Sequence, residues 1–230
     1  YLALDGYKVT VFEKQNALGG MLTLGIPSFR LEKDVVNAEI DILRELGVEF
    51  KTGIEVGKDV ILDDLRKQEY KAFYLAIGAQ SGRKLGVEGE DAEGVISGVD
   101  FVRRINLSEK IKLDGKVLVI GGGNVAIDVA RSSVRVGPRS TEIFCLEQRS
   151  EMPALVDEIT EAEEEGILIH NGWGPKRIMT RDGKVSGVEF KKCVAVFDAN
   201  GRFNPVFNEN ETRLVEADIV LTAIGQSIDW

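Results

Sequence analysis

The chain has 230 residues, enough for one large or two modest domains that each bury a hydrophobic core. It carries 29 lysines and arginines against 38 aspartates and glutamates, and this net charge of −9 argues against nucleic acid and anionic membranes as partners. No apolar stretch approaches the roughly 18 residues that cross a bilayer, and no signal-peptide pattern opens the sequence. We therefore expect a cytoplasmic protein that binds neither nucleic acid nor membranes.

The first third of the chain combines strand and helix patterns with glycine-rich turns. Residues 1–4 are typical of the end of an apolar helix, and residues 7–12 of a buried strand that is followed by Glu13. A strand that ends in a carboxylate suits a unit that holds an adenosine ribose, but the glycine-rich turn of such a unit lies about 20 residues earlier. The elements predicted next are a helix over 34–46, a strand over 48–52, a helix over 60–67 and an apolar, buried strand over 72–77.

An acidic stretch with several glycines, residues 86–98, is the predicted passage between two domains. The elements expected after it are a helix over 99–106, a strand over 116–120, a helix after the turn at 121–123, a strand over 141–147, a helix from 150 or 153 to 165, a β-meander over 176–215 and a strand over 218–223. Asp-Gly and Asn-Gly pairs at 182–183 and 200–201 predict the two hairpin turns of the meander.

Two pairs of segments in the chain resemble each other. YLAIGAQ at 74–80 matches LTAIGQS at 221–227, and KVTVFEK at 8–14 matches TEIFCLE at 141–147. Chance similarity between buried strands could explain either pair alone. Both pairs in the same order favour a duplicated unit whose first copy lacks its opening strand and glycine turn.

The segment KVLVIGGGNVA contains Gly121-x-Gly123-x-x-Ala126, a variant of the dinucleotide-binding fingerprint. The first glycine allows a tight turn, the second removes a side chain that would block a pyrophosphate, and the small alanine lets helix and strand approach. Amide groups at the helix start then face the phosphate charge. The alternative, a tight turn kept for packing alone, is less favoured because an apolar strand precedes the glycines and a helix follows.

Glu147, at the end of the next predicted strand, indicates which dinucleotide binds. A carboxylate there can accept both ribose hydroxyls of NAD and would repel the extra phosphate of NADP. The sequence therefore favours NAD(H) over NADP(H). Arg149 weakens this preference because it could neutralise that phosphate, and Glu147 could also be a solvated strand end.

These features together resemble the small (beta) chain of glutamate synthase and its relatives, which include the flavin module of dihydropyrimidine dehydrogenase and NADH-dependent ferredoxin:NADP oxidoreductases. The resemblance covers nearly the whole chain. The matching segments are VFEK (11–14), LGGML (18–22), GIPSFRL (25–31), YLAIGA (74–79), GEDAEGVISGVDFVRRIN (89–106), IGGGNVAIDVAR (120–131), EMPA (151–154) and ADIVLTAIGQ (217–226). Where many relatives have an Arg-Arg pair that grips NADP, this chain has Leu146-Glu147.

The resemblance implies an α/β fold with two dinucleotide-binding, Rossmann-like domains of the three-layer ββα kind. The NAD domain would be inserted in an incomplete FAD domain. The implied boundaries are 1–112 for the partial FAD domain, which lacks its first strand and glycine loop, 113–222 for the NAD(P) domain with its β-meander, and 223–230 for the return to the FAD domain. The sequence is therefore expected to be a piece of a longer polypeptide.

The resemblance also implies the residues that contact each cofactor. FAD would meet Glu13, Lys14, Gly19, Gly20, Met21, Leu22, Ile26, Pro27, Arg30 and Val56. The nicotinamide dinucleotide would meet Gly121, Gly122, Gly123, Asn124, Val125, Ala126, Asp128, Glu147, Gln148 and Arg149. Ala76, Ile77, Gly78, Ala79, Ala223, Ile224 and Gly225 would approach FAD or the nicotinamide. Viewed singly, Met21 and Leu22 are more often core residues than cofactor walls, and Val56 could be a plain core residue.

The implied reaction is hydride transfer from NAD(P)H, with NADH favoured, to FAD and onward to an iron–sulfur partner or a protein like the glutamate synthase large chain. Cofactor stacking needs no acid or base, so we nominate no catalytic side chain. Cys145, Cys193 and His170 form no metal-ligand or redox motif. Two alternatives stay open: an NAD-binding module without turnover of its own, in which the chain holds FAD poorly, and an assembly subunit with inactive cofactor sites.

Overall fold

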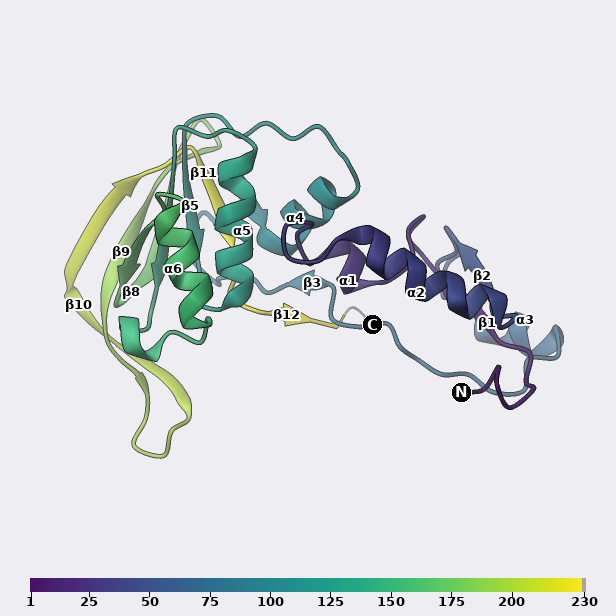
Figure 1. Cartoon of the computed structure of the whole chain (residues 1–230). Coiled ribbons are helices and arrows are strands. Elements are labelled where there is room, and N and C mark those ends of the chain that lie inside the picture. The colour runs from purple at the N-terminus through teal and green to yellow at the C-terminus, as the bar shows by residue number, and fades with distance from the viewer. Residues whose placement is uncertain (229–230) are drawn as a thin grey trace. The chain divides into compact units, whose positions relative to one another are not determined.

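The computed structural model describes residues 1–228, and the chain forms two compact units, Tyr1–Gly78 and Ala79–Trp230 (Figure 1). This division lies earlier than the predicted boundary at 112/113. The reason is that strand β4 (Val95–Ser97) pairs with β11 (Ile219–Thr222) in the sheet of the second unit. Which cofactor each unit holds stays a prediction.

The second unit is built on a five-stranded parallel sheet in the order β4-β11-β5-β6-β7. Its three other strands are β5 (Lys116–Ile120), β6 (Ser140–Cys145) and β7 (Leu168–Asn171). Two short strands of this unit, β3 (Ser81–Gly82) and β12 (Gln226–Ser227), form a separate antiparallel pair. In a parallel sheet all carboxyl ends lie at one edge, so the turns after β5, β6 and β11 are neighbours.

Both faces of this sheet are covered, as Figure 1 shows. Three helices pack on one face: α4 (Gly98–Asn106), α5 (Asn124–Arg135) and α6 (Val156–Glu164). An antiparallel meander packs on the other: β8 (Trp173–Arg181), β9 (Lys184–Phe197) and β10 (Phe203–Glu216). Along β5, Val117 and Val119 join the helix-side core while Leu118 and Ile120 join the meander-side core. The predicted three-layer arrangement is therefore confirmed for this unit.

The first unit has less regular structure and a smaller core. Its two strands, β1 (Thr10–Glu13) and β2 (Glu49–Thr52), pair in parallel. Its helices are α1 (Met21–Leu24), α2 (Lys33–Glu45) and α3 (Leu62–Lys67). The Tyr70 hydroxyl donates to Thr10 Oγ1 at 3.1 Å, and the Tyr70 ring meets Phe12 edge-on, which holds the segment after α3 beside β1.

Three predictions for the first unit are wrong. Residues 1–4 form turns rather than a helix, the strand predicted over 7–12 begins at Thr10 and is only partly buried, and residues 72–77 form no strand. The last segment is exposed, with Tyr74 91% and Leu75 65% accessible. Within residues 1–228 no strand pairs with it, and an apolar segment needs pairing neighbours to become a buried strand.

Most other predicted elements lie within about two residues of those observed, and α6 is the main exception. It begins at Val156 because the chain first forms a 3₁₀ turn, η1 (Arg149–Glu151), and then an extended segment. Among the described residues, no helix has the length and apolar character needed to cross a membrane.

Candidate nucleotide-binding sites

Gly121 makes the turn at the carboxyl end of β5. Its φ is +144°, and a Cβ atom there would lie 2.3 Å from the carbonyl oxygen of Ala223. Its amide donates to the Phe144 carbonyl at 2.9 Å, and the Ala223 amide donates to the Ile120 carbonyl at 2.8 Å. The turn is thus fixed against the ends of both neighbouring strands, which only glycine permits.

Gly122 faces the carboxylate of Glu147. A Cβ on Gly122 would lie 2.5 Å from Glu147 Oε2 and 3.0 Å from Cys145 Cβ. The Glu147 carbonyl accepts bonds from the Gly172 amide and from Asn171 Nδ2, both at 3.1 Å, which fixes this loop. The predicted neighbourhood of Glu147 and the glycine turn is present.

Burial raises the pKa of the Glu147 carboxyl above its usual range, and the nearby charge of Glu151 adds to that rise. An acid whose charged form is disfavoured is kept at a cost to folding, and such groups gather at functional sites. Glu147 is thus partly buried rather than fully solvated, and its role as a ribose ligand stays a prediction.

Gly123 is the N-cap of α5 and leaves open space beside the helix start. A Cβ on it would meet only Pro153 Cγ, at 3.9 Å. The amides of Ala126 and Ile127 donate to the Gly123 carbonyl, whereas the amides of Asn124 and Val125, at the first two helical positions, have no acceptor within the helix. Their amides and the positive end of the helix dipole can meet an anion of pyrophosphate size.

The segment after η1 lies against the glycine turn. The Ala154 amide donates to the Gly122 carbonyl at 3.2 Å, and the Leu155 amide donates to Asn124 Oδ1 at 2.9 Å. The Asn124 side chain therefore caps the start of α6, a role that sequence reasoning missed. The EMPA motif at 151–154 was the available signal, since it marks this segment without saying what it touches.

Gln148 and Arg149 follow Glu147 on the exposed side of the loop. Gln148 and Glu151 form a reciprocal capping box around η1. Arg149 makes a two-pronged ion pair with Glu163 of α6, with Nη1–Oε1 at 2.6 Å and Nη2–Oε2 at 2.7 Å. The carboxylate of Glu163 thus holds the Arg149 guanidinium, a contact that the sequence did not predict.

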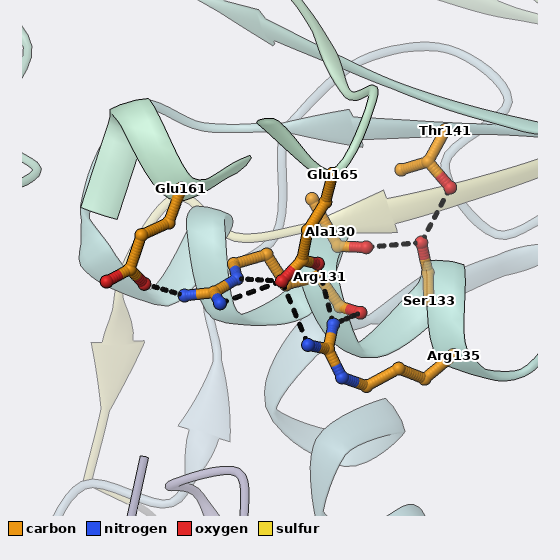
Figure 2. A network of polar contacts seen from close by, with 7 residues as sticks. All are labelled: Ala130, Arg131, Ser133, Arg135, Thr141, Glu161 and Glu165. Carbon is orange, nitrogen blue, oxygen red and sulfur yellow. Dashed lines mark hydrogen bonds and ion pairs between the residues drawn. The ribbon is translucent and has the colours of Figure 1, made fainter. Parts of the chain in front are cut away.

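Helices α5 and α6 are joined by the polar network of Figure 2. Arg131 donates to Glu165 Oε1 at 2.7 and 2.9 Å and also pairs with Glu161, while Arg135 holds the other side of Glu165. The two arginines lower the pKa of the Glu165 carboxyl to about 2. This network fixes α6, and with it Glu163, against the helix that starts at the glycine turn.

Three predicted residues lie after β11, at the same edge of the sheet as the glycine turn. Ala223 bonds to the end of β5, Gly225 has a φ of +114°, and the Gly225 carbonyl accepts the Arg83 amide at 3.0 Å. Ile224 is partly exposed between them. Asp128 is buried within α5, one turn beyond the helix start.

In the first unit, Glu13 ends β1 and its side chain accepts the Gln15 amide at 2.8 Å. Its carbonyl accepts the Ile54 amide, so the residues after β1 and β2 are joined. Gly19 and Gly20 both have positive φ, and a Cβ on Gly19 would lie 2.2 Å from Thr23 Oγ1. These two glycines shape the turn into α1.

The loop around α1 is held by a lysine. Lys33 Nζ donates to the Leu22 carbonyl at 3.0 Å and to the Ile26 carbonyl, and burial lowers the pKa of this amine. Pro27 is buried nearby, whereas Lys14 and Arg30 are exposed. Met21 is half-buried. The structure therefore gathers most of the residues predicted for FAD into two adjoining loops of one unit.

The other residues predicted to approach FAD are exposed in this unit. Val56 is 42% accessible and forms an isolated bridge with Val60. Ala76, Ile77 and Gly78 lie in the exposed segment that forms no strand, and Ala79 begins the second unit. Val56 is therefore no core residue of this unit, and its contact with FAD stays a prediction.

Comparison with known proteins shows the relationship. Residues 1–229 match the family described as pyridine nucleotide-disulphide oxidoreductase. The chain is 40% identical to the NADP(+)-dependent formate dehydrogenase subunit beta of Moorella thermoacetica over 235 residues, 99% of this chain and 33% of that protein. It is 35% identical to the glutamate synthase [NADPH] small chain of Escherichia coli (strain K12) over 247 residues, 100% of this chain and 52% of that protein. The chain thus spans a third to about half the length of these relatives.

Solved structures confirm the fold. The chain superposes on Mycobacterium tuberculosis FprA in complex with NADPH with a TM-score of 0.81 and 20% identity, covering 95% of this chain and 64% of that one. It superposes on T. acidophilum thioredoxin reductase with a TM-score of 0.65 and 18% identity, covering 97% of this chain and 71% of that one. The expected two-dinucleotide α/β fold and the resemblance to the glutamate synthase small chain are both confirmed. The chain belongs to the pyridine nucleotide-disulphide oxidoreductase family.

Proposed function

We propose that residues 79–228 bind a nicotinamide dinucleotide at the turn of Gly121–Gly123, and that the intact protein is a flavin oxidoreductase. The observation that supports this most is the Glu147 carboxylate lying against Gly122 beside an open helix start. Pyrophosphate would lie on the amides at the start of α5, and Glu147 would accept the ribose hydroxyls. Both groups come from loops that are fixed by backbone hydrogen bonds.

We propose further that this chain prefers NADH to NADPH. The relatives are named for NADP or NADPH, but in a dinucleotide-binding unit an acid beside the ribose favours NAD, whereas an arginine there accommodates NADP. In this chain the two residues after β6 are Leu146 and Glu147, and Glu151 lies close enough to act on the Glu147 carboxyl. Two carboxylates at the ribose would repel a 2′-phosphate by like charge.

The residues predicted for FAD fit a nucleotide in part. Glu13 keeps acceptor capacity beyond the bond from Gln15, and the glycine turn before α1 brings backbone close without side chains. When bound, the nicotinamide would supply a hydride and FAD would accept it and release electrons to an iron–sulfur partner. The chain's own residues would bind, orient and shield these groups from water, so we propose no catalytic side chain.

A second candidate function is supported by the exposed apolar segment at 72–77 and the small core of residues 1–78. In that case the 230-residue chain itself is an NAD-binding module without turnover. The flavin absorbance of the purified chain separates the two: a stoichiometric flavin band supports the oxidoreductase for this chain, and its absence with intact NADH binding supports the module.

The decisive experiment is a titration of NADH and NADPH against the chain and its Glu147→Arg variant. We expect Glu147→Arg to weaken NADH and strengthen NADPH, shifting the ratio of the two dissociation constants by about tenfold or more, because a repelling charge becomes an attracting one. Glu211→Arg, the same charge change on exposed β10, is the matched control. An unchanged ratio in Glu147→Arg would defeat the assignment of Glu147, and the absence of saturable binding by either coenzyme would defeat the proposed site.

A further inference from the structure

We propose that Glu163 is a specificity-determining residue: its ion pair with Arg149 withholds that guanidinium from the 2′ position of a bound dinucleotide. This inference rests on the proposed function, since it concerns the same site. It assigns a role in coenzyme choice to a residue of α6 that lies 16 positions beyond Glu147 in the sequence.

The backbone of Arg149 is fixed while its side chain has two possible partners. Arg149 opens η1, which the capping box of Gln148 and Glu151 holds in place. It lies two residues after Glu147, the distance at which an arginine can reach a phosphate on the neighbouring ribose. In the structure its two terminal nitrogens instead meet both oxygens of Glu163, at 2.6 and 2.7 Å.

Glu163 is presented by a helix that cannot easily follow the arginine. The residues two before and two after it, Glu161 and Glu165, pair with Arg131 and Arg135 of α5 (Figure 2). The Leu155 amide at the helix start is bonded to Asn124 Oδ1. Any movement that brings the guanidinium to a nucleotide must therefore break the pair rather than carry α6 along.

The local charge balance depends on whether that pair is intact. Arg149 and Glu147 both act on the Cys145 thiol, the arginine lowering its pKa and the glutamate raising it, so both charges lie near the end of β6. With Arg149 neutralised by Glu163, the carboxylates of Glu147 and Glu151 are left to face the ribose. Freed from Glu163, Arg149 could offset one of these charges and donate to a 2′-phosphate.

The expected effect is modest because the pair is exposed. The side chains of Arg149 and Glu163 are 46% and 45% accessible, and exposed pairs are weak even with two-pronged geometry. Breaking the pair should therefore shift coenzyme preference a few-fold rather than reverse it. Glu147 remains the larger determinant.

The test measures dissociation constants of NADH and NADPH for the unmodified chain, Glu163→Gln, Arg149→Gln and the double variant. We expect Glu163→Gln to raise NADPH affinity relative to NADH by three- to fivefold, and the double variant to lose this gain. Glu164→Gln, which removes the neighbouring charge on the same helix, should leave the ratio within about 1.5-fold.

Each contrary outcome has one meaning. An unchanged ratio in Glu163→Gln, or the same gain in the double variant as in Glu163→Gln, would overturn the role of the ion pair. Either result, obtained with saturable NADH binding intact, leaves the proposed nucleotide site standing. If the unmodified chain bound neither NADH nor NADPH, that result would instead count against the proposed function.

Discussion

Residues 74–78 and 221–225 have closely similar sequences, Tyr-Leu-Ala-Ile-Gly and Leu-Thr-Ala-Ile-Gly, yet they differ in structure. The second contains the end of β11, which pairs with β4 on one side and β5 on the other, and Leu221 is fully buried. Within residues 1–228 no strand pairs with the first, and Tyr74, the counterpart of Leu221, is 91% accessible. An apolar pattern therefore specifies a strand only where neighbouring strands supply hydrogen bonds and covering layers.

The same contrast holds for the two units as wholes. In the second unit, helices and a meander cover opposite faces of one sheet, and two hydrophobic clusters result. The first unit has few fully buried apolar side chains, and several apolar side chains of α2 are exposed, including those of Val35 and Ile42. Backbone pairing and covered faces thus go together in this chain.

The largest expected difference in stability comes from removing one aromatic ring, that of Phe144, from the core of the second unit. Phe144 is fully buried and stacks between His170, at 4.3 Å, and Phe190, at 4.1 Å between ring centroids. We expect Phe144→Ala to lower the free energy of unfolding of this unit by about 3–5 kcal/mol, because a large cavity replaces the ring. Urea unfolding followed by the fluorescence of Trp173 in β8 measures it.

Tyr74→Ala is the matched change in the first unit, where the side chain is exposed. It should alter stability by less than about 0.5 kcal/mol, as surface substitutions usually do. Comparable losses in both variants would mean that residues 72–77 pack as a strand after all, and the contrast between the two similar segments would fail.

The sequence allowed much of the second unit to be predicted, and for a physical reason. Lys116–Ile120, the glycine turn and the meander depend on local patterns: a continuous apolar strand, glycine at strained positions, and turn residues between alternating strands. The site could be predicted as far as Gly121–Ala126 and Glu147, because their spacing along the chain dictates that they meet at one edge of a parallel sheet.

The parts that could not be predicted depend on distant partners. Nothing near Arg149 in the sequence reveals that Glu163 binds it, and nothing near Asn124 reveals that its amide oxygen caps α6. The fate of residues 72–77 is set by which strands are present beside them. Contacts between residues far apart in sequence leave no periodic signal, so they require the folded structure.

Ion pairs as well as burial hold the helix layer of the second unit together. Among the described residues of the first unit, no carboxylate is held by two arginines as Glu165 is. Arg131 and Arg135 hold the pKa of Glu165 at about 2, whereas an ordinary glutamate has a pKa of 4.5. Because the folded pKa is lowered, the stabilisation is present above about pH 4.5 and is lost as pH falls toward 2.

We therefore expect Glu165→Gln to lower the free energy of unfolding by about 1–2 kcal/mol at pH 7 and by less at pH 3, after allowance for the partly exposed Arg135. Urea denaturation at the two pH values checks this. Glu164→Gln on the same helix serves as control and should change stability little at either pH. An equal loss at pH 7 and pH 3 would contradict an electrostatic origin.

Smaller effects than that of Glu165→Gln are expected at Glu13, which ends β1, and at Glu147, which lies two residues after β6, and they should have opposite signs. The Glu13 side chain accepts the Gln15 amide at 2.8 Å, so Glu13→Ala should lower the free energy of unfolding by about 1 kcal/mol.

Burial raises the pKa of Glu147, so its charged form is disfavoured in the folded chain. Stability then falls as pH rises from the unfolded pKa through the folded one, and the full cost is present at pH 7. Glu147→Gln removes that charge and should raise the free energy of unfolding by about 0.5 kcal/mol while weakening NADH binding. Thermal unfolding without nucleotide, paired with an NADH titration, measures both, and a Glu147→Gln variant that lost stability would show that this carboxylate serves the fold rather than a ligand.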